Sequence, residues 1–157
     1  MKNIFVNIEE IKKESDRLKD IGKEIVFTNG VFDIIHRGHI EYLNEAKSLG
    51  DILIVGLNSD KSVKMIKGDS RPINNENDRA LVLSNLKAID FVIIFSEDNP
   101  YNVISAIIPD ILVKGGDWKK ENIIGADVVE NYGGKVISLK FIDNYSTTEL
   151  IEKMKKN

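Results

Sequence analysis

Short apolar runs alternate with amphipathic segments along almost the whole chain of 157 residues. Residues 52–57 read ILIVGL, an uninterrupted apolar run that is expected of a strand buried on both faces of a parallel sheet. Residues 39–49 instead carry Ile40, Leu43 and Ala46 at a spacing that places them on one face of a helix. This alternation predicts βαβ units, in which helices cover both faces of a parallel sheet.

The same two patterns recur from residue 8 to residue 156. Strands are predicted at residues 25–27, 52–57, 91–95, 111–113 and 136–139. Helices are predicted at residues 8–21, 39–49, 76–88, 100–108, 123–132 and 146–156. We therefore expect an α/β fold, a three-layer, doubly wound, Rossmann-like parallel sheet formed by residues 1–157 as a single domain.

Ligands bind such sheets beyond the carboxyl ends of the strands, near a topological switch point. The segments of chemical interest are therefore the loops at residues 28–39, 58–74 and 114–118, and the entry to the last helix at residues 143–148.

The composition excludes several classes of chemistry. The chain has no cysteine, so disulfides, a thiolate nucleophile and cysteine-ligated metals are impossible. Its formal net charge of −3 argues against a wide basic surface for nucleic acid, so an anionic partner should be small and held by local cations. No apolar run approaches the roughly 20 residues of a membrane-spanning helix, and the N-terminal residues lack the apolar region of a secretion signal. We expect a cytoplasmic protein without nucleic-acid or membrane partners.

The two histidines of the chain, His36 and His39, stand three residues apart in the first of these loops. The loop leads into a helix, whose N-terminus offers free N–H groups and a partial positive charge to anions. Two imidazoles at this spacing point the same way and can donate hydrogen bonds to phosphate oxygens. Gly30 lets the backbone approach a phosphate closely. We predict that the pair stabilises negative charge on a triphosphate during a reaction.

Other interpretations of these residues stay open. The histidines could ligate a metal together with Asp33, or be ordinary loop residues. The phosphate motifs GxGxxG and GxxxxGK[ST] are absent. Lys64 could be a solvated loop lysine, and Trp118 could only pack at the edge of the core. Ser146 and Glu149 form a capping-box pattern at the start of the last helix, which does not exclude a phosphate contact there.

Four segments, in order, resemble a known family. "TNGVFDIIHRGH" is similar to the signature of the HxGH nucleotidyltransferases, the cytidylyltransferase-like superfamily. "NSDKSVKMIKGDSRPINNENDRALVLSNLKAIDFV", "PDILVKGGDW" and "DNYSTTELI" follow at family positions, so the resemblance covers residues 8–155. "KGDSRP" and "KGGDW" favour the heptose 1-phosphate adenylyltransferase branch. Residues 141–145 lack the arginine that cytidylyltransferases carry there, which counts against glycerol 3-phosphate as the acceptor, and Asn144-Tyr145 replaces the Gly-Cys usual in the heptose branch.

The resemblance implies three sets of site residues. The expected catalytic residues are His36, His39, Lys67 and Arg79. The expected nucleotide contacts are Thr28, Asn29, Gly30, Phe32, Asp33, His36, Gly38, His39, Lys114, Gly115, Asp117, Ser146, Thr147 and Thr148. The expected acceptor contacts are Asp33, Lys67, Arg71, Lys114 and Trp118.

The resemblance also implies a reaction. D-glycero-β-D-manno-heptose 1-phosphate would attack the α-phosphorus of ATP, giving ADP-heptose and pyrophosphate, with Mg²⁺ as a cofactor that no protein residue is predicted to ligate. A homodimer is expected, as is a separate sugar kinase, because no kinase domain fits in 157 residues. Alternatives are another cytidylyltransferase-like enzyme such as a glycerol-3-phosphate cytidylyltransferase, a metal-dependent hydrolase, and a non-catalytic nucleotide-binding module.

Overall fold

A parallel six-stranded sheet forms the centre of the computed structural model, which describes residues 3–140 and 146–156. The strand order is β1-β4-β3-β2-β5-β6, and every neighbouring pair is parallel. The strands are β1 (Ile4–Phe5), β2 (Ile25–Gly30), β3 (Ile52–Asn58), β4 (Phe91–Phe95), β5 (Ile111–Gly115) and β6 (Lys135–Leu139).

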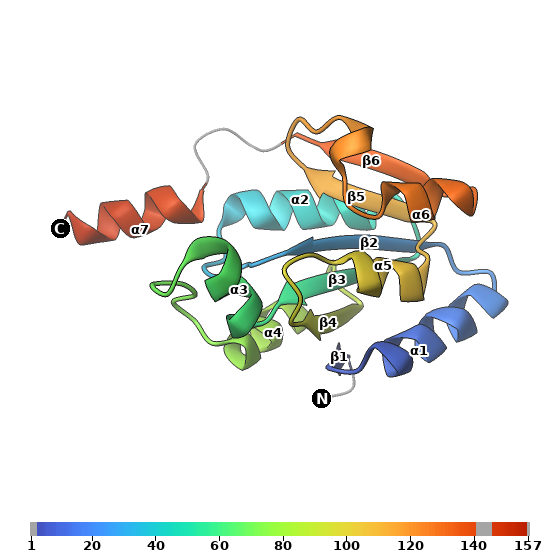
Figure 1. The fold of residues 1–157 in the computed structure, drawn as a ribbon, viewed down its shortest axis with the longest axis horizontal. Helices are drawn as coiled ribbons and strands as arrows, with labels where there is room; N and C mark the ends of the chain where they lie inside the picture. The colour runs from blue at the N-terminus through green and yellow to red at the C-terminus, as the bar shows by residue number, and fades with distance from the viewer. Residues whose placement is uncertain (1–2, 141–145, 157) are drawn as a thin grey trace.

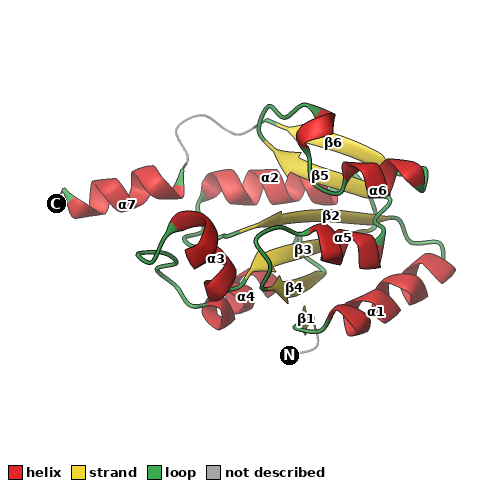
Figure 2. Ribbon diagram, viewed as in Figure 1, coloured by secondary structure: helices red, strands yellow, loops and turns green. Residues whose placement is uncertain are grey.

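Helices cover both faces of the sheet, as Figures 1 and 2 show. The helices are α1 (Ile8–Asp20), α2 (Arg37–Lys47), α3 (Asp60–Lys67), α4 (Glu76–Ser84), α5 (Tyr101–Ile107), α6 (Ala126–Asn131) and α7 (Thr147–Lys155), with a 3₁₀ turn at Lys120–Asn122. Apolar residues of α2 and α4 pack in one core cluster, and those of α1, α5 and α6 pack in a second. Successive strand residues point to opposite faces, so the fully buried strands supply both clusters. The predicted three-layer α/β fold is confirmed.

The chain changes direction in the sheet between β2 and β5. It runs outward from β2 through β3 to β4, and then returns to place β5 on the other side of β2. The carboxyl ends of β2 and β5 therefore diverge into separate loops at this point. Such a switch point is where open α/β sheets bind ligands.

The two ends of the sheet differ in how their polar groups are used. At the amino ends of the strands, carboxylates accept backbone hydrogen bonds: Asp110 from Ile25 N at 2.7 Å, and Asp90 from Leu53 N at 2.7 Å. Asp110 precedes β5 and binds the start of the neighbouring β2, and Asp90 precedes β4 and binds the start of the neighbouring β3. The amino edge is thereby closed by protein groups, whereas the carboxyl edge carries the loops that contain the histidines and several lysines.

The sequence-based boundaries need correction at three places. Residues 58–74 were expected to form one loop, but α3 begins inside it at Asp60 with Ser59 as its N-cap. The helix predicted at residues 76–88 ends at Ser84. The short strand β1 was not predicted; it pairs with the edge of β4. The five predicted strands are all present.

No helix in the described residues is long and apolar enough to cross a membrane. Residues 141–145, where the sequence lacks the arginine of the cytidylyltransferases, lie outside the described part of the chain.

Two leucines on α4 offer a test of where the core lies. Leu83 is fully buried, whereas Leu81 is 44% exposed. We expect Leu83→Ala to lower the free energy of unfolding by about 2–5 kcal/mol, because it leaves a cavity in the core. Leu81→Ala removes the same atoms from the same helix and should lower the free energy of unfolding by less than about 1 kcal/mol. Urea unfolding followed by circular dichroism measures both, and equal losses would contradict this packing.

Candidate active site

A cavity of about 600 Å³ opens at the carboxyl ends of β2, β3 and β5, beside the switch point. Its walls come from the loop after β2, from α3 and the loop after it, from the segment after β4, from the end of β5, and from the start of α7. The lining residues are Asn29, Gly30, Val31, Phe32, Asp33, His36, Gly38, His39, Tyr42, Asn58, Ile66, Lys67, Arg71, Asp98, Asn99, Pro100, Lys114, Gly115, Trp118, Ile124, Ser146, Thr147 and Thr148.

The two histidine rings stack on each other at the start of α2. His36 is the N-cap residue, and its ring centroid lies 3.8 Å from that of His39, with 21° between the planes. Phe32 packs on the other ring, with 5.3 Å between its centroid and that of His39. Phe32 adopts a positive φ of 47°, and its ring lies so close to Gly30 that a Cβ added there would be 2.8 Å away. Glycine at residue 30 therefore makes room for the ring that supports the histidines.

The histidine pair is electrically neutral at pH 7. Burial, together with the neighbouring His36, lowers the pKa of His39 to about 4, and burial also lowers the pKa of His36. The backbone N–H of His36 donates to Nδ1 of His39 at 3.4 Å. Because Nδ1 accepts this bond, the ring carries its proton on Nε2, which is then the donor available to a ligand.

Two lysines contribute positive charge to the cavity wall. Lys67 ends α3, and Lys114 lies in β5 with its Nζ 5.7 Å from the centroid of the Trp118 ring. Burial lowers the pKa of Lys114. In the described residues, no carboxylate lies within ion-pair distance of either lysine. An anion that enters the cavity meets cations that no carboxylate of the described residues neutralises.

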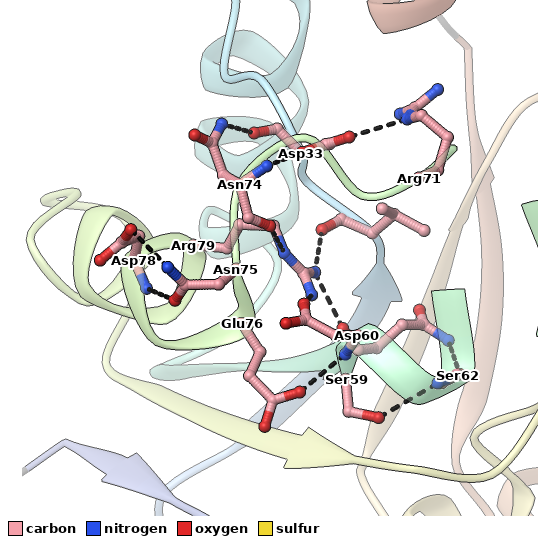
Figure 3. A network of polar contacts seen from close by, with 12 residues as sticks. Asp33, Ser59, Asp60, Ser62, Arg71, Asn74, Asn75, Glu76, Asp78 and Arg79 are labelled. Carbon is pink, nitrogen blue, oxygen red and sulfur yellow. Dashed lines mark hydrogen bonds and ion pairs between the residues drawn. The ribbon is translucent and has the colours of Figure 1, made fainter. Parts of the chain in front are cut away.

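The carboxylate of Asp33 reaches the loop between α3 and α4 (Figure 3). Its carboxylate accepts hydrogen bonds from Arg71 Nε at 2.8 Å, Ile73 N at 2.9 Å and Asn74 N at 2.9 Å. Burial alone would raise the pKa of Asp33, but the N–H groups of Asn74 and Ile73 and the Arg71 guanidinium bring it below its ordinary value. The carboxylate is therefore a charged anchor between two loops.

Arg79 has the most buried cation in the structure that residues 3–140 and 146–156 describe, with its side chain 0% exposed. Its guanidinium donates to the carbonyl oxygens of Asn74 at 2.9 Å, Val31 at 2.7 Å and Asn58 at 2.8 Å, and to Asp60 Oδ1 at 2.8 Å. These partners lie on three segments: the loop after β2, the junction of β3 and α3, and the loop before α4. Figure 3 shows Arg79 with Asp60 and Asn74. Arg79 does not line the cavity itself.

The start of α7 forms the remaining wall. Ser146 Oγ accepts a hydrogen bond from Glu149 N at 3.2 Å, so the predicted cap is present. Thr147 Oγ1 donates to the carbonyl oxygen of Ile34 at 3.4 Å, which joins α7 to the histidine loop. Hydroxyls and free N–H groups at a helix start suit phosphate oxygens.

Most of the predicted site residues line this one cavity. Three do not: Thr28, Asp117 and Arg79. Thr28 is buried beneath it, where its hydroxyl lies 2.6 Å from Tyr42 Oη, and Asp117 is exposed. Lys64 also lies outside the cavity wall, as expected of a solvated lysine.

Sequence reasoning missed the wall formed by Asp98, Asn99 and Pro100. The signal was available, because these residues follow β4 directly at the carboxyl edge of the sheet. Asn58, at the end of β3, also lines the cavity; it belongs to the predicted segment 58–74 but was not among the predicted site residues.

The described residues provide no set of side chains that could ligate a metal ion. In the described part of the chain, no group of three His, Asp or Glu side chains could hold a metal ion. Asp33, the carboxylate considered as a partner for the histidines, is instead held by Arg71 and two backbone N–H groups.

The chain resembles proteins of one family along most of its length. The family model described as cytidylyltransferase-like matches residues 27–153. The chain is 50% identical to the bifunctional protein HldE of Aliarcobacter butzleri and 52% identical to that of Nitratiruptor sp., in each case over 95% of this chain. It spans about a third of the length of these curated relatives, 30% and 31% respectively.

Solved structures show the same fold. A lipopolysaccharide core biosynthesis protein from Thermoplasma volcanium is 34% identical, with a TM-score of 0.62 over 80% of this chain and 100% of that one. A pantoate-β-alanine ligase from Francisella tularensis, at 17% identity and a TM-score of 0.65 over 99% of this chain and 78% of that one, shares the fold alone.

The parallel sheet, the stacked histidines at its switch point and these matches together define a nucleotidyltransferase. The chain belongs to the cytidylyltransferase-like family.

The neutral state of His39 predicts a measurable titration. The pKa is 6.5 in the unfolded chain and about 4 in the folded one, so the unfolded state binds more protons between these values. Stability should therefore fall as the pH drops from about 6.5 toward 4. Nitrogen-15 NMR of the imidazoles should show His39 as the Nε2–H tautomer, titrating below pH 5. A His39 that titrates near 6.5 would contradict the burial described here.

Arg79 should be required for folding more than for contact with a ligand. We expect Arg79→Met to lower the free energy of unfolding by about 3–5 kcal/mol, because Asp60 and three carbonyl groups lose their partner. Arg17→Met, at an arginine whose side chain is 58% exposed in a surface pair with Glu14, is the matched control and should cost under about 1 kcal/mol. Guanidinium chloride unfolding measures both. An Arg79→Met protein of unchanged stability that loses only nucleotide binding would support the direct phosphate contact predicted from the sequence.

Proposed function

We propose that this protein transfers an adenylyl group from ATP to a sugar 1-phosphate, with D-glycero-β-D-manno-heptose 1-phosphate as the acceptor and ADP-heptose and pyrophosphate as products. The observation that carries the proposal is the cavity that brings the histidine pair, Lys67, Lys114 and the start of α7 together at the switch point. The heptose acceptor is supported by the "KGDSRP" and "KGGDW" segments and by the similarity to bifunctional HldE proteins and a lipopolysaccharide core biosynthesis protein.

The acceptor supplies its own nucleophile. A phosphate monoester has a second pKa of about 6, so it is mostly a dianion at neutral pH. One of its oxygens attacks the α-phosphorus of ATP, the bond from that phosphorus to the bridging oxygen of the β-phosphate breaks, and pyrophosphate leaves. The protein needs neither a serine nor a cysteine nucleophile, and its task is to align two polyanions and stabilise the charge.

The neutral histidines suit this task. In the proposed reaction, Nε2–H of His39 donates to an oxygen of the triphosphate, with His36 stacked beside it. A neutral donor inside a partly dehydrated site stabilises charge as it develops without needing a proton from solution. Lys67, together with the hydroxyls and N–H groups at the start of α7, would hold the leaving pyrophosphate.

Lys114 and Trp118 are proposed to bind the acceptor. Lys114 lies beside the tryptophan ring and has no carboxylate partner in the described residues. Trp118 is 48% exposed, although its Nε1 donates to Gly115 O at 3.0 Å. A half-exposed ring fixed in this way offers a flat apolar surface to a sugar while the ammonium takes its phosphate.

Mg²⁺ is proposed as the cofactor, held mainly by the substrate. Mg²⁺ prefers oxygen ligands and commonly binds through one or two carboxylates and substrate phosphates. In the described cavity wall, Asp98 is the one carboxylate not tied to another loop, and it accepts a bond only from its neighbour Asn99. Bound there, Mg²⁺ would neutralise phosphate charge.

The proposed reaction also requires a supplier of its acceptor. A sugar 1-phosphate is formed by phosphoryl transfer to a sugar, so we propose a sugar kinase as the preceding activity. The curated relatives are named bifunctional and are about three times as long as this chain. We further propose that the enzyme acts in the cytoplasm, where ATP is available, and as a homodimer.

A pyrophosphate-release assay tests the activity and its specificity. ATP, CTP, GTP and UTP are crossed with heptose 1-phosphate and glycerol 3-phosphate, and we expect release with ATP and heptose 1-phosphate. Activity with CTP and glycerol 3-phosphate alone would overturn the heptose assignment. His39→Ala should lower kcat/KM by about 10²–10³-fold, as the loss of one charge-stabilising donor does elsewhere. Glu45→Ala, at an exposed residue of the same helix, should retain wild-type activity.

A further inference from the structure

The side chain of Arg71 lies between a buried carboxylate and the cavity. Its Nε donates to Asp33 Oδ2 at 2.8 Å, and the side chain is 13% exposed. Arg71 is also part of the cavity wall, and its terminal nitrogens point away from Asp33 in Figure 3. No group in residues 3–140 or 146–156 accepts a hydrogen bond from Nη1 or Nη2 of this arginine. One edge of the guanidinium is thus used by the protein, and the other is available to a ligand.

The carboxylate of Asp33 is committed to the loop that carries Arg71. It is 0% exposed and accepts bonds from Ile73 N and Asn74 N as well as from Arg71. Asn74 Nδ2 donates in return to the backbone oxygen of Asp33 at 2.6 Å. Asp33 therefore fixes the backbone just after Arg71 and one nitrogen of its side chain, and its oxygens have no exposed area for a substrate.

We propose that Asp33 is a positioning residue that holds Arg71 so that its two terminal nitrogens bind a terminal phosphate of a substrate in bidentate fashion. The inference rests on the proposed function, since it assumes that phosphorylated substrates occupy the cavity. A phosphate monoester on the acceptor and the outer phosphates of ATP offer the same chemistry, and the two arms of the experiment distinguish them.

Only arginine can serve both partners at once. Its planar guanidinium presents Nε to one anion and the Nη pair to another at fixed angles. The ammonium of lysine is a single charged centre, and it cannot span the buried carboxylate and a phosphate in the cavity with the same geometry. Arg71→Lys therefore changes the shape of the cation while it preserves the charge.

The experiment measures KM for ATP and KM for the acceptor separately in pyrophosphate release. We expect Arg71→Lys to raise KM for one of the two substrates by about 10- to 100-fold and to change the other KM less than threefold, because one charge-assisted bidentate contact is lost. Asp33→Asn should raise the same KM. The double variant should exceed the more impaired single variant by less than threefold, because both residues act through one contact.

Matched controls and a binding measurement complete the test. Arg17→Lys and Asp16→Asn make the same chemical changes in exposed pairs on α1 and should leave both KM values unchanged. Calorimetric titration of each protein with ATP and with heptose 1-phosphate reports binding without turnover. If Asp33→Asn fails to fold, Asp33→Glu takes its place, because it keeps the charge but shifts the carboxylate by one methylene, and it should raise the same KM as Arg71→Lys.

Two results would overturn different claims. If the wild type binds and converts the substrates and Arg71→Lys retains both KM values, the bidentate role is wrong while the proposed function stands. If the double variant shows the full product of the two single effects, Asp33 does not act through Arg71. A wild type that binds neither ATP nor heptose 1-phosphate overturns the proposed function and, with it, the assignment of Arg71 to a substrate phosphate.

Discussion

The buried guanidinium of Arg79 holds in place the loops that form one side of the cavity. Its hydrogen bonds reach the loop after β2 through Val31, the junction of β3 and α3 through Asn58 and Asp60, and the loop before α4 through Asn74. A cation taken out of water carries a large desolvation cost, which is offset only when its donors are paired in good geometry. Four bonds to protein acceptors satisfy this condition. Because the three segments meet at one guanidinium, the wall of the cavity is built before any ligand arrives.

Arg71 is a second arginine that contributes to this side of the cavity, and it lines the cavity itself. Arg71 and Arg79 lie eight residues apart, and both contact the stretch that ends at Asn74, Arg71 through Asp33 and Arg79 directly. The sequence presents them as two similar basic residues near a phosphate-binding motif. In the structure one is a buried support and the other faces the cavity. The difference comes from the surroundings of each side chain, since the residue type is the same.

The sequence could predict the sheet because the buried strands are runs of apolar residues that cannot be mistaken for surface. It predicted the cavity through His36, His39 and Lys114, which follow or end strands at one edge of the sheet. It could not predict α3, since that segment is short and charged and has few buried side chains. It could not separate Arg71 from Arg79 either, because their surroundings are made by residues up to 48 positions away. Loop-to-loop hydrogen bonds of this kind leave no periodic pattern in a sequence.

The contrast between the two ends of the sheet has a consequence for how a substrate arrives. At the amino edge Lys47 pairs with Asp90, and at the carboxyl edge Arg71 pairs with Asp33, whereas Lys67 and Lys114 have no carboxylate partner in the described residues. In a chain with a net charge of −3, these two lysines attract an anion locally at the opening of the cavity. Such an attraction reaches only about 10 Å at 0.1 M salt. The two lysines can therefore orient an anionic ligand only during its last approach, with its charged end toward the cavity.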